Sequence, residues 1–463
     1  MVMMDDPSEI KSIRSVVARG VAISAAGNLS LRFLDMGIAV LLLRLLSIFE
    51  FGLYQLALAT YNFATSFFLS GLENVVVNDV SQNLATNKNK ARAIFTFYAY
   101  FLVLMALALW AVFFFGSAFL RPWIPVGSNY LKIISFLFLL APLETVLKMK
   151  FQILLDFGWA TAFRVLRDIS RIVVIVGVFW FSSFGVVGAL WSLVGAVGIP
   201  IVIALIGYRR QGLLKILNFA EIREAASDLF FRHGKWALLD DFVSNSGSNI
   251  HPFLIRWLVG TEAVALFAVA QKLYSYTLTL FPIREILTPI LPRVSDDLER
   301  LKSHINKATK YATVAFFILA IASAIGAPVI VYILFPKYIP SLPLFYILLF
   351  GMPWFGFRSV VQPVFYAKKA QKILFLLTIV RIVMITGLGI VLMRFWGIWG
   401  AAFEMMLVGI LLNPPFARAL KTILPGWQFE WKSLCRIDDY DKTMARTILR
   451  VCWNRIRPLY RRL

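Results

Sequence analysis

The sequence has few of the residues from which active sites and metal centres are usually built. Only two of its 463 residues are cysteines, Cys435 and Cys452, and only three are histidines. These numbers exclude a disulfide framework and a zinc site of the Cys/His type. Nucleotide-binding loops of the form GxxxxGK[ST] and GxSxG nucleophile motifs are also missing. We therefore expect neither an enzyme nor an ATP-driven pump, and no cofactor or metal.

Strand-like alternation of polar and apolar residues is missing too, which argues against a β-barrel. Apolar residues are plentiful instead: 60% of the chain is hydrophobic and the mean hydropathy is +0.76. Runs of roughly 20 apolar residues recur, and each is long enough to cross ~30 Å of hydrocarbon as a helix. The first twenty residues are polar and the first apolar run is too long for a secretory signal, so we expect none.

The apolar runs predict twelve membrane spans, at about 21–46, 52–79, 94–116, 130–149, 163–182, 185–207, 236–259, 262–291, 309–335, 342–366, 373–393 and 397–417. Between these spans, 35 Lys and Arg residues fall on one side and only Arg121, Lys337 and Arg394 on the other. The positive-inside rule then places both termini in the cytoplasm. The net charge of +22 therefore reflects topology and attraction to anionic lipids rather than nucleic-acid binding.

The chain contains two similar stretches, residues 19–82 and 235–293, each a pair of apolar runs joined by a short turn. Arg44 and Glu50 are six residues apart, as are Arg256 and Glu262. Such self-similarity is common in transporters built from repeats. We predict an all-α membrane protein of two homologous six-helix bundles, 21–207 and 236–417, around a central cavity. A cytoplasmic N-terminus (1–20), an amphipathic linker (208–235) and a basic cytoplasmic tail (418–463) complete the predicted domains.

The segment LLLRLLSIFEFGLYQLALA resembles the opening of flippases for polysaccharide repeat units, in which an apolar helix is followed by Arg-Leu-Leu-Gly, an acidic turn and Gly-Leu-Tyr. Ser47 replaces the usual glycine. The segment AVALFAVAQKLYSYTLTLFPIREILTPILPRVSD is similar to the matching motif of the second half. These flippases belong to the multidrug/oligosaccharidyl-lipid/polysaccharide exporter superfamily. A twelve-helix form favours the O-antigen or exopolysaccharide type over lipid II flippases, which usually have two extra helices.

Ionisable residues inside spans are the candidate site residues, because each costs roughly 2.5–3.5 kcal/mol at a helix centre. The candidates for a cationic, substrate-binding lumen are Arg32, Arg358, Arg381, Lys272 and Arg284. Arginine binds phosphate bidentately and stays charged when desolvated. Structural ion pairs between helices are the alternative role. Arg32 and Asp35 are three residues apart, so they share a helix face and are able to pair.

Three acids, Asp35, Glu73 and Glu404, are candidates for coupling to protons or sodium, since a buried carboxylate is able to exchange a proton. Arg44 and Arg171 we place near span ends, where long side chains reach the interface. His233, His251 and His304 are scattered and suggest no site.

The resemblance implies a flippase of the cell (inner) membrane that moves an undecaprenyl-diphosphate-linked oligosaccharide by alternating access. Its implied partners are this lipid-linked substrate, the bilayer, a polysaccharide polymerase and chain-length proteins, with no nucleic acid. One alternative is a cation-coupled multidrug exporter, whose lumen should be net negative. Another is a membrane glycan polymerase or ligase, which usually needs a large outer loop, whereas turns such as SIFE and LVGT are short.

Overall fold

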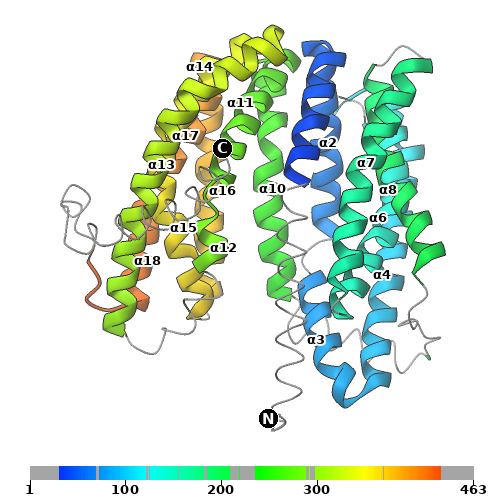
Figure 1. Cartoon of the computed structure of the whole chain (residues 1–463), viewed down its shortest axis with the longest axis horizontal. Coiled ribbons are helices and arrows are strands. Elements are labelled where there is room, and N and C mark those ends of the chain that lie inside the picture. The colour runs from blue at the N-terminus through cyan, green and yellow to red at the C-terminus, as the bar shows by residue number, and fades with distance from the viewer. Residues whose placement is uncertain are drawn as a thin grey trace, which may run out of the picture. The chain divides into compact units, whose positions relative to one another are not determined.

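A computed structural model describes residues 31–68, 72–120, 126–154, 156–181, 185–208, 235–287, 298–368 and 370–428, with the single residues 122, 124, 218 and 291. These residues are helical almost throughout and include no strand (Figure 1).

A first helix covers residues 31–45. It is followed by α2 (Ile48–Phe68), α3 (Glu73–Thr86), α4 (Lys88–Phe115), α5 (Ser117–Leu120), α6 (Ser128–Ile153), α7 (Phe157–Phe181) and α8 (Val186–Gly207). The later helices are α10 (Lys235–Leu258), α11 (Thr261–Thr279), α12 (Ile283–Leu287), α13 (Leu298–Leu334), η3 (Pro336–Ser341), α14 (Leu342–Phe350), α15 (Met352–Ala367), α16 (Gln371–Trp396), α17 (Ile398–Leu411) and α18 (Asn413–Ile423).

Each predicted span overlaps a helix, but four of them are broken. The breaks separate α2 from α3, α11 from α12, α14 from α15, and α17 from α18. Proline explains two of these breaks, because α15 and α18 each have a proline in the first two helical positions. Proline lacks the N–H that a helix interior needs, and it fits the first turn of a new helix.

Among the described residues, six helices are long and apolar enough to cross a membrane, or seven if α14 and α15 form one span. The six include α4, α6, α8, α13 and most of α16, and the sixth runs from α17 into α18. The helices α2, α7, α10 and α11 are as long as spans but are not among the six. Polar or charged residues are spread along these four helices, and such residues require neighbours other than lipid.

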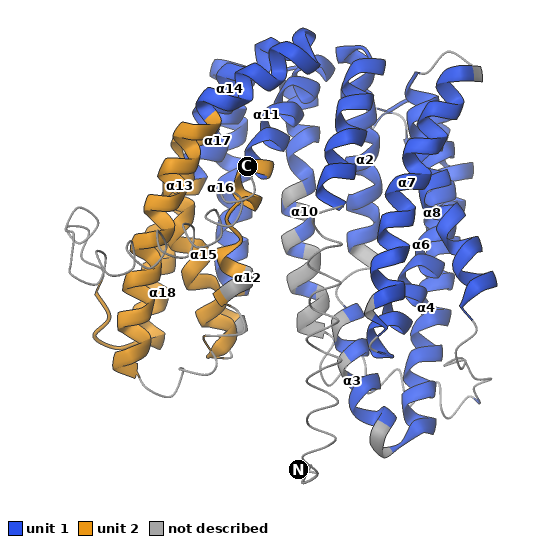
Figure 2. Ribbon diagram, viewed as in Figure 1, with its two compact units in different colours: residues 1–275, 324–348, 375–408 blue, residues 276–323, 349–374, 409–463 orange. Residues whose placement is uncertain are grey.

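The described chain separates into two compact units (Figure 2). Unit 1 comprises residues 1–275, 324–348 and 375–408, and unit 2 comprises 276–323, 349–374 and 409–463. The divisions fall inside α11, α13, α14, α16 and α17, so the units are not the two predicted bundles. The predicted domain boundaries therefore stay a prediction.

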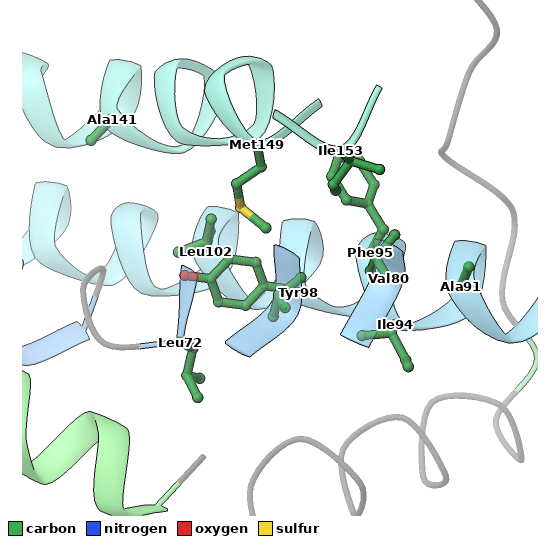
Figure 3. Close-up of a cluster of buried hydrophobic side chains, with 11 residues drawn as sticks. Leu72, Val80, Ala91, Ile94, Phe95, Tyr98, Leu102, Ala141, Met149 and Ile153 are labelled. Atoms are coloured by element: carbon green, nitrogen blue, oxygen red, sulfur yellow. The ribbon is translucent and has the colours of Figure 1, made fainter. Parts of the chain in front are cut away.

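In unit 1, an apolar core joins α3 and α4 to α6 (Figure 3). Val76 and Val80 of α3 are fully buried, and so is Met149 of α6. Tyr98 of α4 lies among them with its ring stacked near that of Phe101. The valines are four residues apart, so one face of the otherwise polar α3 packs against α4 and α6.

The two similar stretches found in the sequence form the same local structure. In the first, the helix over residues 31–45 and α2 are separated by two residues, and in the second the same number separates α10 from α11. Ser47 begins α2 with a capping box: its N–H and hydroxyl both donate to Glu50 Oε2 at 2.8 Å, and the Glu50 N–H donates to Ser47 Oγ at 3.2 Å. Gly260 makes the second turn with φ of 139°, a conformation that favours glycine.

Some predicted segments lie outside the described residues. These are the N-terminus (1–20), the linker (208–235) except Tyr208, Asn218 and Lys235, and the basic tail beyond residue 428. The first residues of that tail are helical, because α18 continues past the predicted end of the last span and includes Arg418 and Lys421.

Candidate functional site

Four polar residues meet in unit 1, and we call them the polar cluster: Asp35, Tyr54, Arg171 and Lys272. Lys272 Nζ of α11 lies 3.5 Å from Asp35 Oδ1 of the first helix. The Arg171 guanidinium of α7 donates a hydrogen bond to the Tyr54 hydroxyl of α2. The two pairs are close enough for electrostatic interaction, since Asp35 and Arg171 each act on both Tyr54 and Lys272.

The polar cluster is partly exposed. Lys272 and Asp35 have 36% and 47% of their side chains exposed. Asp168 also interacts with Asp35 and Arg171, and it is ion-paired to Arg167. Counted with these neighbours, the polar cluster has three cations and two carboxylates and is net positive. Arg32 adds an exposed cation one turn before Asp35 on the same helix. Such a group suits an anion of the phosphate type, and whether Arg32 also pairs with Asp35 stays a prediction.

A second group of charges joins α6 to α7 and is more deeply buried. Glu144 is 9% exposed, and its Oε1 lies 2.5 Å from Lys148 Nζ and 3.3 Å from Arg167 Nη1. Arg167 also approaches Asp168 at 3.4 Å. Here one buried carboxylate is shared by two cations, which is the arrangement of a structural ion pair.

The remaining predicted site residues are spread over both units. In unit 1, Arg381 is half-buried in α16, and Glu73 is the first residue of α3, where a negative charge stabilises a helix N-terminus. In unit 2, the Arg358 guanidinium lies 5.6 Å from the centre of the Phe355 ring, a cation–π contact, and Arg284 is exposed in α12. A single lumen containing all five predicted cations therefore stays a prediction.

Glu404 is the most buried acid of those predicted, at 1% exposure, and it is hydrogen-bonded to His251. His251 Nε2 of α10 meets Glu404 Oε2 of α17. The Phe267 ring of α11 lies 4.7 Å from the imidazole, centre to centre. Sequence reasoning assigned His251 to no site, because its partner is 153 residues away.

Two basic residues cap helix ends at the predicted extracytoplasmic side of unit 1. Arg44 Nε donates to the carbonyl of Leu334, the last residue of α13, at 2.8 Å. Lys337 Nζ donates to the carbonyls of Arg44, at 3.1 Å, and of Leu46. Burial lowers the pKa of Lys337, and the nearby charge of Glu50 opposes that change. Arg44, which the sequence predicts to reach the interface, therefore has a specific partner in the Leu334 carbonyl.

Arg171 was placed near a span end by the sequence, but it lies well inside α7, ten residues before the last residue of that helix. The signal that was available is the run of Arg164, Arg167, Asp168 and Arg171, whose helical spacing puts charges on one face. Nothing in the sequence pointed to its partner, Tyr54, which is 117 residues away.

Comparisons with known proteins give a family and a fold. A family described as "Polysaccharide biosynthesis protein" matches residues 41–343. A search of curated proteins finds no match. The structure is similar to an inward-facing multidrug resistance MATE family transporter of the MOP superfamily, with a TM-score of 0.72 at 16% identity, covering 85% of this chain and 94% of that one.

Two further solved structures have the same fold. The lipid II flippase MurJ, in an inward closed conformation, has a TM-score of 0.71 at 16% identity, over 90% of this chain and 89% of that one. A MATE family transporter in an outward-facing conformation gives 0.53 at 16% identity, over 87% of this chain and 93% of that one. The predicted fold class, an all-α multi-pass membrane protein, is confirmed.

Proposed function

The chain belongs to the polysaccharide biosynthesis protein family, and from this premise we propose that it is a flippase for a lipid-linked oligosaccharide. The cargo would be an undecaprenyl-diphosphate-linked repeat unit of the O-antigen or exopolysaccharide type. It would cross the inner membrane from the cytoplasmic to the outer leaflet by alternating access. The observation that carries the proposal is the net positive polar cluster inside helices that belong to the membrane-spanning fold.

The chemistry of the cluster supports an anionic cargo. A diphosphate offers several acceptor oxygens, and Arg171 and Lys272 offer N–H donors beside Tyr54 and Asp35. The polyprenyl tail would remain in lipid while the charged headgroup passes the cluster. Arg32 and Arg381 would extend the cationic surface within unit 1, and Arg284 and Arg358 of unit 2 stay sequence candidates.

Asp35 gives the cluster a means of coupling. It is ion-paired to Lys272, so binding of a diphosphate to Lys272 competes with that pair. Protonation of Asp35, or sodium binding to it, would release Lys272 for the cargo. Binding of the cation and of the cargo would then favour each other, as linkage requires. Glu73, at the start of α3, remains a weaker candidate for the same role.

The alternative functions make different demands on the site. A multidrug exporter of organic cations needs a net negative lumen, and the polar cluster is net positive. A glycan polymerase or ligase needs an outer loop to hold its acceptor. In this chain only two residues join the first helix to α2, and only two join α10 to α11. A polysaccharide polymerase and chain-length proteins would act as partners downstream of the flippase.

Reconstitution of the full-length protein tests the proposal. Vesicles containing an undecaprenyl-diphosphate-linked oligosaccharide would be assayed for the glycan fraction that becomes accessible to an added lectin. Lys272→Gln should lower the rate about tenfold or more, since a charge-assisted hydrogen bond contributes ~1.5–3 kcal/mol. Arg394→Gln is the matched control, because Arg394 is exposed at the end of α16. Export of an organic cation with no movement of the lipid would instead establish the multidrug exporter.

A further inference from the structure

The buried pair of His251 and Glu404 is separate from the polar cluster and has an unusual hydrogen-bonding balance. Both side chains are nearly inaccessible, with 10% of the imidazole and 1% of the carboxylate exposed. Glu404 Oε2 is hydrogen-bonded to His251 Nε2. The second oxygen, Glu404 Oε1, is buried and has no hydrogen-bond partner among the described residues. A buried carboxylate oxygen without a donor is costly as long as the group is ionised.

Counting protons shows what the pair requires. Suppose that one proton lies between Nε2 and Oε2 and that neither His251 Nδ1 nor Glu404 Oε1 carries a proton. A neutral imidazole then donates to a carboxylate, and the pair has a net charge of −1. One further proton makes the pair neutral, either as imidazolium with carboxylate or as imidazole with carboxylic acid. A net charge is costly in a low-dielectric interior, and the further proton would remove that cost. When water reaches the site, the cost falls and the additional proton is able to leave.

The surroundings favour a proton over a metal cation. A Cβ atom on Gly389 of α16 would lie 3.7 Å from Glu404 Cγ, and 3.5 and 3.8 Å from the side chains of Met393 and Leu254. The Phe267 ring covers the imidazole. These neighbours supply no oxygen ligands, and no group of three His, Cys, Asp or Glu side chains able to hold a metal occurs among the described residues. A sodium ion requires several oxygen ligands, whereas a proton requires one basic atom.

The surrounding helices carry other charges. They are Lys235, Asp240, Asp241 and Arg256 on α10, Glu262 and Lys272 on α11, and Lys372, Arg381 and Arg394 on α16. Arg256 is five residues from His251, about 7.5 Å along the helix, and Asp241 is ten, about 15 Å. Glu404 is the only ionisable residue of α17. On α10 and α17, no other ionisable residue therefore lies within four residues of His251 or Glu404.

We propose that His251 and Glu404 together form a proton-binding site, and that uptake and release of one proton there drives the movement of the cargo. The step is a proton transfer only: water on one side of the membrane donates the proton to the pair, and water on the other side accepts it. No bond to carbon, phosphorus or a metal is made or broken. The coupling part of this inference rests on the proposed flippase function, whereas the binding of the proton does not.

Infrared difference spectroscopy of the full-length protein in lipid vesicles, without substrate, tests the binding. Spectra would be compared from about pH 5 to about pH 8, across the usual range of histidine titration. We expect a pH-dependent carbonyl band of a protonated carboxyl group that Glu404→Gln abolishes. Glu299→Gln, at an 83% exposed carboxylate outside the apolar part of α13, should leave this band in place. The amide band of the same spectra reports whether each variant is folded.

The histidine has its own test, because His251→Gln should shift the pH at which the Glu404 band appears. A band that persists in Glu404→Gln, or one whose midpoint His251→Gln leaves unchanged, would overturn the shared site. The transport assay then examines coupling: an imposed pH gradient should accelerate the wild type and have no effect on Glu404→Gln. If the gradient accelerated lipid movement equally in the wild type and in Glu404→Gln, the coupling would be overturned and the proton-binding site would stand. If the wild type moved no lipid, only the flippase proposal would be rejected.

Discussion

The backbone carbonyl of Thr261 occupies the space that a side chain on Gly52 would need. A Cβ atom built on Gly52 would overlap that oxygen and would lie 2.9 Å from Thr261 Cγ2. Gly52 is the fifth residue of α2, and Thr261 is the first residue of α11, so the two similar stretches of the sequence meet here. Arg44 and Lys337 donate hydrogen bonds to backbone carbonyls in the same unit. These contacts join the turns at the predicted extracytoplasmic end of unit 1.

Gly52→Ala should strain the close contact between α2 and the first residue of α11. Backbone atoms cannot move aside as a flexible side chain does, and overpacking of this kind costs about 1–3 kcal/mol. Thermal unfolding of the purified protein in detergent, followed by tryptophan fluorescence, would show a lower midpoint. Gly37→Ala is the control, because a Cβ atom there meets nothing within 4 Å and alanine favours a helix. Equal midpoints for the two variants would contradict the close approach.

Lys337→Ala should destabilise the protein more than Arg44→Ala. Lys337 donates to two carbonyls at the end of the first helix, and a cation is favourable at a helix C-terminus. We expect a loss of about 1–2 kcal/mol for Lys337→Ala and less for the exposed Arg44. Because both residues bind backbone oxygens, neither substitution removes the acceptor of the other. The double variant should therefore show nearly the sum of the two losses, and strong non-additivity would refute independent capping.

The sequence predicted the helices well because a span needs only a long apolar run. It also identified Asp35, Lys272 and Glu404 as ionisable residues inside apolar runs, and the structure places each of them within a helix. Their partners could not be predicted. Lys272 and Asp35 are 237 residues apart, and helical periodicity says which residues share a face but not which helix that face meets. Packing decides that rotation, so His251 looked like an isolated histidine until α10 and α17 were placed together.

Glu144→Gln should test whether the α6–α7 charges are structural. The substitution leaves Lys148 and Arg167 without their shared carboxylate, and we expect a loss of about 1–3 kcal/mol, because both cations are about one third exposed. The exposed pair of Glu299 and Lys302 provides the comparison, since Glu299→Gln should change the stability by less than about 1 kcal/mol. Thermal unfolding of both variants measures the difference. Similar losses would show that burial of Glu144 has no effect on the strength of its ion pairs.

Tyr54→Phe and Tyr338→Phe remove the same hydroxyl group from two buried rings with opposite expected results. The Tyr54 hydroxyl accepts a hydrogen bond from Arg171, so Tyr54→Phe leaves a half-buried guanidinium without that acceptor and should cost about 1.5–3 kcal/mol.

The Tyr338 hydroxyl is buried with no hydrogen-bond partner among the described residues. Its removal relieves an unsatisfied polar group while the ring keeps its contacts with Phe51 and Phe335. Tyr338→Phe should therefore be neutral or stabilising in the thermal unfolding assay. If Tyr54→Phe were equally harmless, the hydrogen bond that orients Arg171 in the polar cluster would be unimportant, and Lys272 would be left as the main donor for the cargo.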